Sequence, residues 1–347
     1  MPSSTPAKPT SPPRNGTLRL ALPSDRQMED DTMAFMQKCG LDVSRPNKRI
    51  YTGKIGVLKG VEVIFQRSVD IPGELDAGVI DAAILGYERF LENRNEKGDS
   101  FAVLKDLGFS RSNLVVAVPN AWHDVRTSKD LARMAKARRL RVGTKYHRLV
   151  GDYLRRKGVS PYDLIHINGA IEAAPLIGTA DVISDMVSSG ATLRENNLRP
   201  LDDGTIVESA ACFVVNRRLL KSDAKKLEMT KTLLELIEAR LRAEGFYSII
   251  ANIRGESVEA VAARVTKNPI VAGMQGPTVS TVVSKTGDRG WYSVSVVVPI
   301  AQLAAGVDHL RKIGASGVVV FPAHYVFGGR CEAYEELVKA LNAKRGE

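Results

Sequence analysis

The chain has 347 residues, 44% of them hydrophobic, which is enough to bury more than one core. Lys and Arg outnumber Asp and Glu by 49 to 39, which favours anionic ligands, but the basic residues are scattered. A polyphosphate substrate, or merely a soluble surface, explains this balance at least as well as nucleic acid, so we expect no nucleic-acid partner. Three distant cysteines and five histidines without metal-ligand spacing predict neither a disulfide framework nor a zinc site.

No apolar run is long enough to cross a bilayer, and the first residues do not resemble a secretory signal. Residues 1–17 are rich in Pro, Ser and Thr, and we predict a disordered tail there. We therefore expect a cytoplasmic protein without a membrane partner.

The first folded segment alternates apolar strands with helices. We predict strands at 18–23, 61–67 and 81–86, and helices at 28–39 and 70–78. This alternation favours a parallel sheet, and open sheets of this kind bind ligands at strand ends. Arg67 and Asp81 are charged residues at such ends, although from spacing alone a solvated charge is the more common explanation.

A second α/β unit follows. We predict strands at 113–119, 140–144 and 164–167, and helices at 128–137 and 149–157. Lys145, Tyr146 and Arg148 follow the second of these strands. Glu172 is an isolated acid among small residues, and it could bind a sugar hydroxyl or a metal, or simply occupy the first turn of a helix.

The stretch Asp181–Leu198 has the outline of a phosphate-binding loop. A short apolar strand carries Asp185 near its end, and five small residues follow it: Ser188, Ser189, Gly190, Ala191 and Thr192. Small residues let backbone N–H groups converge on an anion, and a helix start adds a favourable partial charge. From spacing alone, an ordinary strand-to-helix connection remains the more common interpretation.

The pattern changes after a strand at 210–216 and a long helix at 223–245. We predict a β-α-β-β-α-β series at 247–253, 257–265, 279–284, 291–299, 303–313 and 317–321. This is the ferredoxin-like pattern, which indicates a separate domain but not its role.

Several of these segments together resemble the long form of ATP phosphoribosyltransferase, the first enzyme of histidine biosynthesis. The resemblance covers nearly everything after the tail. It rests on Phe65-Gln66-Arg67 with Asp70-Ile71, on 169–175, on 185–198, on Gly273-Met274-Gln275-Gly276-Pro277-Thr278 and on Ile313-Gly314-Ala315-Ser316-Gly317.

The resemblance implies an α/β fold with two periplasmic-binding-protein-like domains and a C-terminal ferredoxin-like α+β regulatory domain. The implied domains are 18–112 with 204–244, 113–203, and 245–347. It also implies that ATP and phosphoribosyl pyrophosphate condense to phosphoribosyl-ATP and pyrophosphate, with inhibition by histidine, in a dimer or hexamer.

Site residues follow from the same resemblance. Residues 188–192 would hold the 5′-phosphate, and Asp185 and Glu172 the ribose hydroxyls and Mg²⁺. Arg67, Asp81 and Tyr146 fall at positions associated with the nucleotide. The regulatory histidine would contact Thr278, Gly314 and Ala315.

The sequence departs from the family pattern near the implied site. Asp25-Arg26-Gln27 stands where Lys-Gly-Arg is usual, Ala83 replaces a glycine, Asn113 replaces an arginine, and His147-Arg148 replaces Pro-Asn. Arg26 or Arg148 could compensate for the missing cations. The alternative is a catalytically weak paralogue that binds ligands or acts as a regulatory subunit. A periplasmic solute-binding protein shares the topology but is disfavoured by the missing signal and the added domain.

Overall fold

The chain forms two compact units in a computed structural model that describes residues 16–271, 276–283, 287 and 289–343. The first unit contains the residues up to Glu235 and those from Glu332 onward, and the second contains Leu236–Cys331. Over the described ranges, no helix combines the length and hydropathy needed to span a bilayer.

A seven-stranded sheet organises the first part of unit 1, in the order β2-β3-β4-β1-β5-β12-β6. Its strands are β1 (Leu18–Pro23), β2 (Val43–Ser44), β3 (Thr52–Ile55), β4 (Val61–Gln66), β5 (Ala82–Gly86), β6 (Ser100–Leu104) and β12 (Ala211–Asn216). The central strands β4, β1 and β5 are parallel, whereas β12 runs antiparallel to β5. The carboxyl ends of the parallel strands therefore meet at one edge, where open sheets place their ligands.

Helices cover this sheet and connect its strands. They are α1 (Arg26–Lys38), α2 (Ile71–Ala77), α3 (Tyr87–Asn93), α8 (Arg217–Ser222) and α9 (Ala224–Ala243). Ile71, Leu75 and Phe90 from α2 and α3 join a buried cluster with β1, β5 and β12. The sequence did not predict α3, which begins directly after Gly86 without a side-chain cap.

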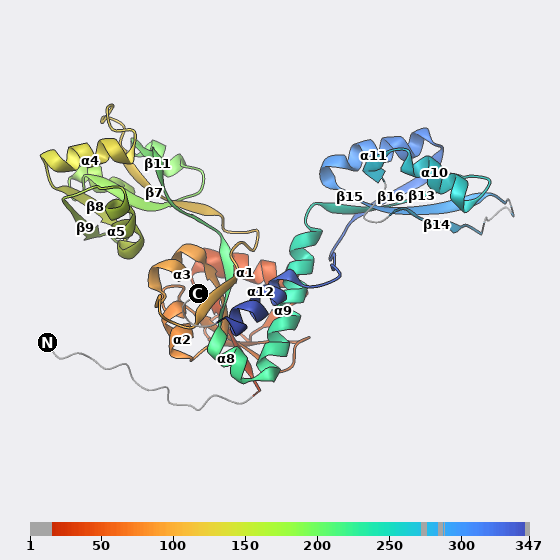
Figure 1. Cartoon of the computed structure of the whole chain (residues 1–347), viewed down its shortest axis with the longest axis horizontal. Helices are drawn as coiled ribbons and strands as arrows, with labels where there is room; N and C mark the ends of the chain where they lie inside the picture. Colours follow the sequence, from red (N-terminus) through yellow and green to blue (C-terminus); the bar gives the residue numbers. More distant parts are fainter. Residues whose placement is uncertain (1–15, 272–275, 284–286, 288, 344–347) are drawn as a thin grey trace. The chain divides into compact units, whose positions relative to one another are not determined.

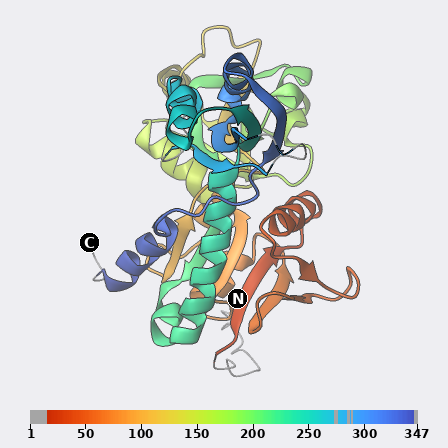
Figure 2. The same ribbon diagram turned by 90° about the vertical axis from the view of Figure 1, so that its right-hand side faces the viewer.

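The last helix, α12 (Glu332–Asn342), belongs to unit 1, although the predicted C-terminal domain includes its residues. Its buried residues Ala333, Leu337 and Leu341 lie on one face, and the helix contacts β6 and α8. Both ribbon views show α12 beside α9 (Figures 1 and 2), and Lys231 of α9 lies 5.6 Å from the Tyr334 ring centroid. Apolar burial thus holds α12 on the first unit.

The second sheet of unit 1 has the order β11-β7-β10-β8-β9. Its strands are β7 (Ser112–Pro119), β8 (Leu140–Thr144), β9 (Tyr162–His166), β10 (Val182–Val187) and β11 (Leu198–Ser209). Strands β8, β9 and β10 are parallel, and β7 is antiparallel to β10. This order puts β10, with Asp185, between β7 and β8.

Alternating residues of this sheet face two separate cores, as the two-residue period of a strand requires. One core packs α4 (Ser128–Ala137) and α5 (His147–Arg156) against Leu114, Val116 and Val118 of β7. The other packs the 3-10 helix Ile171–Ala173, α6 (Ala174–Ile177) and α7 (Ala191–Glu195) against Val115 and Ala117. Glu172 and the loop before α7 therefore lie on the same face of the sheet.

Unit 2 contains a four-stranded antiparallel sheet in the order β14-β15-β13-β16. Its elements are β13 (Phe246–Arg254), α10 (Val258–Thr266), the 3-10 helix Pro269–Val271, β14 (Thr278–Thr281), β15 (Trp291–Pro299), α11 (Ile300–Lys312) and β16 (Ala315–Pro322). Figure 1 shows α10 and α11 on one face of this sheet. The connectivity and strand order confirm the predicted ferredoxin-like domain.

Candidate active site

The phosphate-binding loop predicted from the sequence lies at the carboxyl end of β10. We call residues Ser188–Thr192 the cradle. Gly190 has φ +72°, a left-handed conformation that favours glycine, and it caps the amino end of α7. The Arg194 guanidinium donates to the Ser189 carbonyl at 3.2 Å, and the Ala191 N–H lies 3.3 Å from Ser189 Oγ. Local contacts therefore hold the turn in shape.

The cradle and both predicted acids line one small pocket of about 70 Å³. Its lining residues are Glu172, Asp185, Met186, Val187, Ser188, Ser189, Gly190, Thr192 and Leu193. Two carboxylates thus face the same space as a turn rich in small residues. This arrangement suits a phosphorylated sugar, whose hydroxyls need acceptors and whose phosphate needs N–H donors.

Asp185 has an unusual electrostatic environment. Its Oδ1 atom is buried and accepts no hydrogen bond among the described residues, although the Lys145 ammonium lies 3.5 Å away. A buried carboxylate oxygen without a hydrogen-bond donor is costly unless a ligand supplies one. Asp185 can therefore accept a hydrogen bond from a hydroxyl group or coordinate a cation through this oxygen.

Tyr146 is a buried residue next to the site and does not line either pocket. The residue is 2% exposed and belongs to the core of the second sheet, and the Arg89 guanidinium lies 4.8 Å from its ring centroid. Burial raises the pKa of the Tyr146 hydroxyl, and the positive charge of Arg89 offsets only part of this effect. The phenol therefore stays protonated at neutral pH.

A larger pocket of about 560 Å³ draws side chains from both sheets of unit 1. We call it the α3 pocket, and its lining residues are Asp25, Met28, Ser68, Val69, Gly86, Glu88, Arg89, Asn93, Lys145, His166 and Asn168. Its volume falls in the range of small-molecule sites. Sequence reasoning missed Arg89, Glu88 and His166; the signal available for the first two was their place directly after a strand ending in Gly86.

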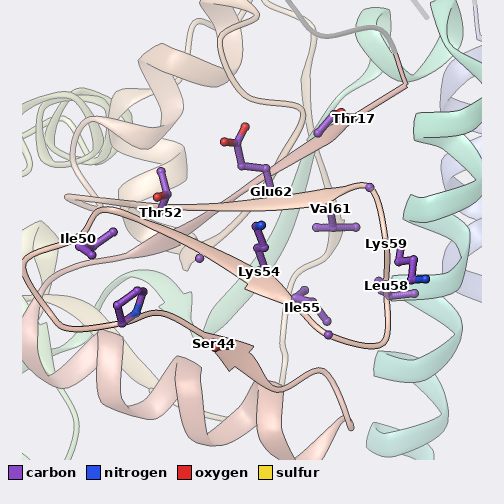
Figure 3. A pocket seen from close by; sticks show the side chains of 14 residues that line it. Thr17, Ser44, Ile50, Thr52, Lys54, Ile55, Leu58, Lys59, Val61 and Glu62 are labelled. Carbon is purple, nitrogen blue, oxygen red and sulfur yellow. The ribbon is translucent and has the colours of Figure 1, made fainter.

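Another pocket, of about 730 Å³, lies over strands β3 and β4 of the first sheet (Figure 3). Figure 3 shows the side chains of Lys54 and Glu62, which come from neighbouring strands, on its wall. None of the 14 described residues that line it is a predicted site residue. We therefore place the candidate active site at the cradle and the α3 pocket.

Asp81 does not lie with the other predicted site residues. It precedes β5, at the amino end of the strand, whereas the parallel strands of this sheet present their carboxyl ends to the α3 pocket. Its side chain accepts from the Lys226 ammonium at 2.8 Å and from the Arg19 N–H at 2.8 Å, and the residue is 1% exposed. Asp81 thus forms a buried ion pair and does not line the α3 pocket, so its nucleotide contact stays a prediction.

Comparison with known proteins identifies the family of the chain. The family model described as ATP phosphoribosyltransferase matches residues 67–239, and the model described as HisG, C-terminal domain, matches residues 243–325. ATP phosphoribosyltransferase 2, chloroplastic, from Arabidopsis thaliana is 36% identical over 332 residues, covering 93% of this chain and 80% of the plant protein. The chain belongs to the ATP phosphoribosyltransferase family.

Bacterial relatives and a solved structure fit this assignment. An ATP phosphoribosyltransferase from Bradyrhizobium sp. (strain ORS 278) is 33% identical over 90% of this chain and 94% of its own length. A chain of the ATP phosphoribosyl transferase (HisG:HisZ) complex from Thermotoga maritima is 26% identical, with a TM-score of 0.51. That match covers 64% of this chain and 99% of the Thermotoga chain. The resemblance seen in the sequence is therefore confirmed.

The departures from the family pattern have structural partners. The Asp25 carboxylate, which stands where the family usually has lysine, accepts from the Ser68 N–H at 2.8 Å and from the Ser68 hydroxyl. It thus joins the segment after β1 to the segment after β4. Gln27 donates to Asp31 on the exposed surface of α1.

Arg67 follows β4, its side chain is 70% exposed, and it forms an ion pair with Asp70 at 2.9 Å. The next residue, Ser68, lines the α3 pocket, but Arg67 does not. Asn113, in place of the family arginine, pairs in register with Val187, the residue just before the cradle. Ala83 is buried in β5.

Arg148 is not available to compensate for missing cations in the α3 pocket. Its guanidinium donates to the Glu92 carbonyl at 3.0 Å and to the Glu96 carboxylate at 2.6 Å. Arg89 and Lys145 are instead the cations that line the pocket. Arg89 forms a long ion pair, 3.9 Å, to Glu88.

The three predicted regulatory residues do not meet within one ferredoxin-like sheet. Thr278 begins the edge strand β14, and Ala315 begins the opposite edge strand β16, with Gly314 before it at φ +90°. Three strand spacings of about 4.8 Å separate these edges. Gly273, Met274 and Gln275 lie outside the described residues.

Proposed function

We propose that this member of the family is a working ATP phosphoribosyltransferase, which transfers the phosphoribosyl group of phosphoribosyl pyrophosphate to ATP and releases pyrophosphate. This is the first step of histidine biosynthesis. The observation that carries the proposal is the pocket in which the cradle, Asp185 and Glu172 come together.

The cradle would bind the 5′-phosphate. Ser188 and Ser189 offer hydroxyl donors, Gly190 lets the backbone approach closely, and Ala191 and Thr192 begin α7 with N–H groups that lack partners further back in the helix. Glu172 and Asp185 would accept from the ribose hydroxyls. These contacts fix the sugar and leave its anomeric carbon open to attack.

The residues fit a magnesium ion that arrives with the substrate. Mg²⁺ prefers oxygen ligands and is commonly held by one or two carboxylates plus substrate phosphates. Asp185 Oδ1 is buried without a hydrogen-bond donor, and Glu172 lines the same pocket. Across the described residues there is no group of three or more potential metal-ligating side chains, so the rest of the shell would come from water and substrate. When bound, Mg²⁺ would neutralise charge on the leaving pyrophosphate.

Nucleotide and pyrophosphate would occupy the α3 pocket, where Arg89 and Lys145 supply positive charge. N1 of adenine is itself nucleophilic, so transfer with inversion needs no dedicated base. Positioning of the two substrates and stabilisation of the leaving group then dominate the rate. The protonated Tyr146 phenol and its buried ring would keep Arg89 in place at the border of the pocket.

Histidine inhibition and self-association belong to the same proposal. Because Thr278 and Ala315 lie on opposite edges of one sheet, a site using both would combine the ferredoxin-like domains of two copies. Ile250, Val319 and Phe321 are exposed apolar residues on strands β13 and β16, and they share one face by register. Such a surface supports a homo-oligomer.

Product formation tests the proposal directly. Purified chain with Mg²⁺, ATP and phosphoribosyl pyrophosphate should form phosphoribosyl-ATP and release pyrophosphate, measured by chromatography and a coupled pyrophosphate assay. Asp185→Asn should abolish the signal, whereas Asp163→Asn, which alters an exposed acid of the same sheet, should not. Saturating histidine should lower the rate and change the size on a sizing column.

The weak-paralogue alternative predicts a different result. It is favoured by Asp25, which places an acid rather than a cation on the wall of the α3 pocket. Calorimetry would then show binding of phosphoribosyl pyrophosphate without product, and the gene would not complement a strain that lacks the enzyme.

A further inference from the structure

Helix α3, which follows the first sheet, contacts the amino end of α5, which follows β8 of the second sheet. The Glu92 carboxylate accepts the Arg148 N–H at 2.9 Å on Oε1 and the Leu149 N–H at 3.0 Å on Oε2. The first N–H groups of a helix have no partner within it. Glu92 therefore caps α5 from a different element, and its negative charge also suits the positive end of the helix.

Two further contacts strengthen this junction. The Arg148 side chain donates to the Glu92 carbonyl at 3.0 Å and to the Glu96 carboxylate at 2.6 Å. One turn earlier on α3, Arg89 lies over the ring of Tyr146, the residue that precedes α5. Contacts from α3 thus hold residues 146–149 at several points.

Lys145 directly precedes the segment held in this way. Its ammonium lies 3.5 Å from Asp185 Oδ1, and it lines the α3 pocket together with Arg89. A shift of the first turn of α5 would therefore move the Lys145 ammonium relative to both the cradle and the α3 pocket. A misplacement of about 1 Å in an active site can lower the rate roughly 100-fold.

We propose that Glu92 is a positioning residue, which fixes the amino end of α5 on α3 and thereby sets the spacing of Lys145 from Asp185 for phosphoribosyl transfer. The role rests on the proposed function. It also gives a reason for Arg148, which replaces the usual family residue and whose side chain donates to Glu92 on α3 and to Glu96 just after α3.

The contact lies outside the hydrophobic cores of the two sheets, because Glu92 and Arg148 are charged and only half-buried. Loss of the Glu92 carboxylate should therefore change the junction more than the folding of either sheet.

The test compares three variants. Glu92→Gln keeps the size of the side chain but turns an amide NH2 toward one of the two N–H donors. Glu96→Gln alters an acid that is 66% exposed and whose hydrogen bond in the described part of the chain comes from the Arg148 side chain. Arg148→Ala keeps the backbone N–H that donates to Glu92. We expect kcat/KM to fall roughly 10- to 100-fold in Glu92→Gln, mainly through kcat, and less than threefold in Glu96→Gln. Arg148→Ala should lie between them.

Hydrogen exchange gives a readout independent of turnover. The peptide containing the amides of Arg148 and Leu149 should exchange faster in Glu92→Gln, while peptides of β8 and β5 should not change. Unchanged exchange in the first turn of α5 would overturn the capping contact, and faster exchange with unchanged kcat/KM would overturn the positioning role. If the wild-type chain formed no product, the proposed function would fail, and the affinity for phosphoribosyl pyrophosphate by calorimetry would decide the positioning role in place of kcat/KM.

Discussion

Replacement of Asp81 by asparagine distinguishes a structural role from a nucleotide contact. The Asp81 and Lys226 side chains are 2% and 7% exposed, and their charged atoms lie 2.8 Å apart. Removing one partner of a buried pair leaves the other charge uncompensated, which typically costs about 3–5 kcal/mol. We therefore expect Asp81→Asn to lower the free energy of unfolding by about that amount, with Lys226→Met similar.

The assay combines urea unfolding, followed by circular dichroism, with the KM for ATP. Because Asp81 lies at the amino end of β5, Asp81→Asn should leave the KM of the folded fraction within about twofold, a change of under 0.5 kcal/mol. The double variant Asp81→Asn/Lys226→Met should recover part of the lost stability, since no buried charge then remains. A loss of stability below about 1 kcal/mol, combined with a large rise in KM for ATP, would refute the reasoning and restore Asp81 to the nucleotide site.

Three more predictions follow from the same geometry. Gly190→Ala places a side chain at φ +72°, 3.2 Å from Arg194, so it should cost about 1–2 kcal/mol and weaken phosphoribosyl pyrophosphate binding in calorimetry; unchanged affinity would argue against the cradle. Asp25→Lys should lower thermal stability rather than raise activity, because Ser68 loses its acceptor; a large gain in kcat would instead support the weak paralogue. Burial alone would raise the pKa of Asp203, but hydrogen bonds from Ser128 and Lys157 outweigh burial and lower the pKa to about 2. The ionised carboxylate should therefore stabilise the fold above about pH 4, and this contribution should be lost as the pH falls from about 4 to 2. Asp203→Asn should show a weaker acid dependence of the melting temperature in that window, and an unchanged dependence would contradict the assignment.

The sequence predicted those parts of the site that depend on neighbouring residues. The cradle is five consecutive residues after a strand, and Gly190 is the one that takes a left-handed conformation. Its shape therefore follows from local chemistry. Glu172 and Asp185 line the same pocket because the segments that carry them pack on the same face of the second sheet, whereas the sequence paired them only through the family resemblance.

The remaining features depend on contacts that sequence spacing does not reveal. The partner of Asp81 is Lys226, 145 residues away, so the carboxylate looked like a free strand-end charge. The partners of Arg148 lie more than fifty residues earlier, in a helix that was not predicted and in the turn after it. Likewise, nothing local indicated that Asp25 accepts hydrogen bonds from Ser68, 43 residues later.

The division of the chain into two units indicates that unit 2 can be deleted as a whole. Unit 2 begins at Leu236, within α9, and ends at Cys331, just before α12. These two helices are in contact through Lys231 and Tyr334. Its two ends are therefore neighbours, as in a domain inserted into a loop of another protein. Deleting residues 236–331 and rejoining the flanks with a short linker should yield a chain that keeps both sheets of unit 1. Such a chain would show whether the proposed histidine inhibition depends on unit 2.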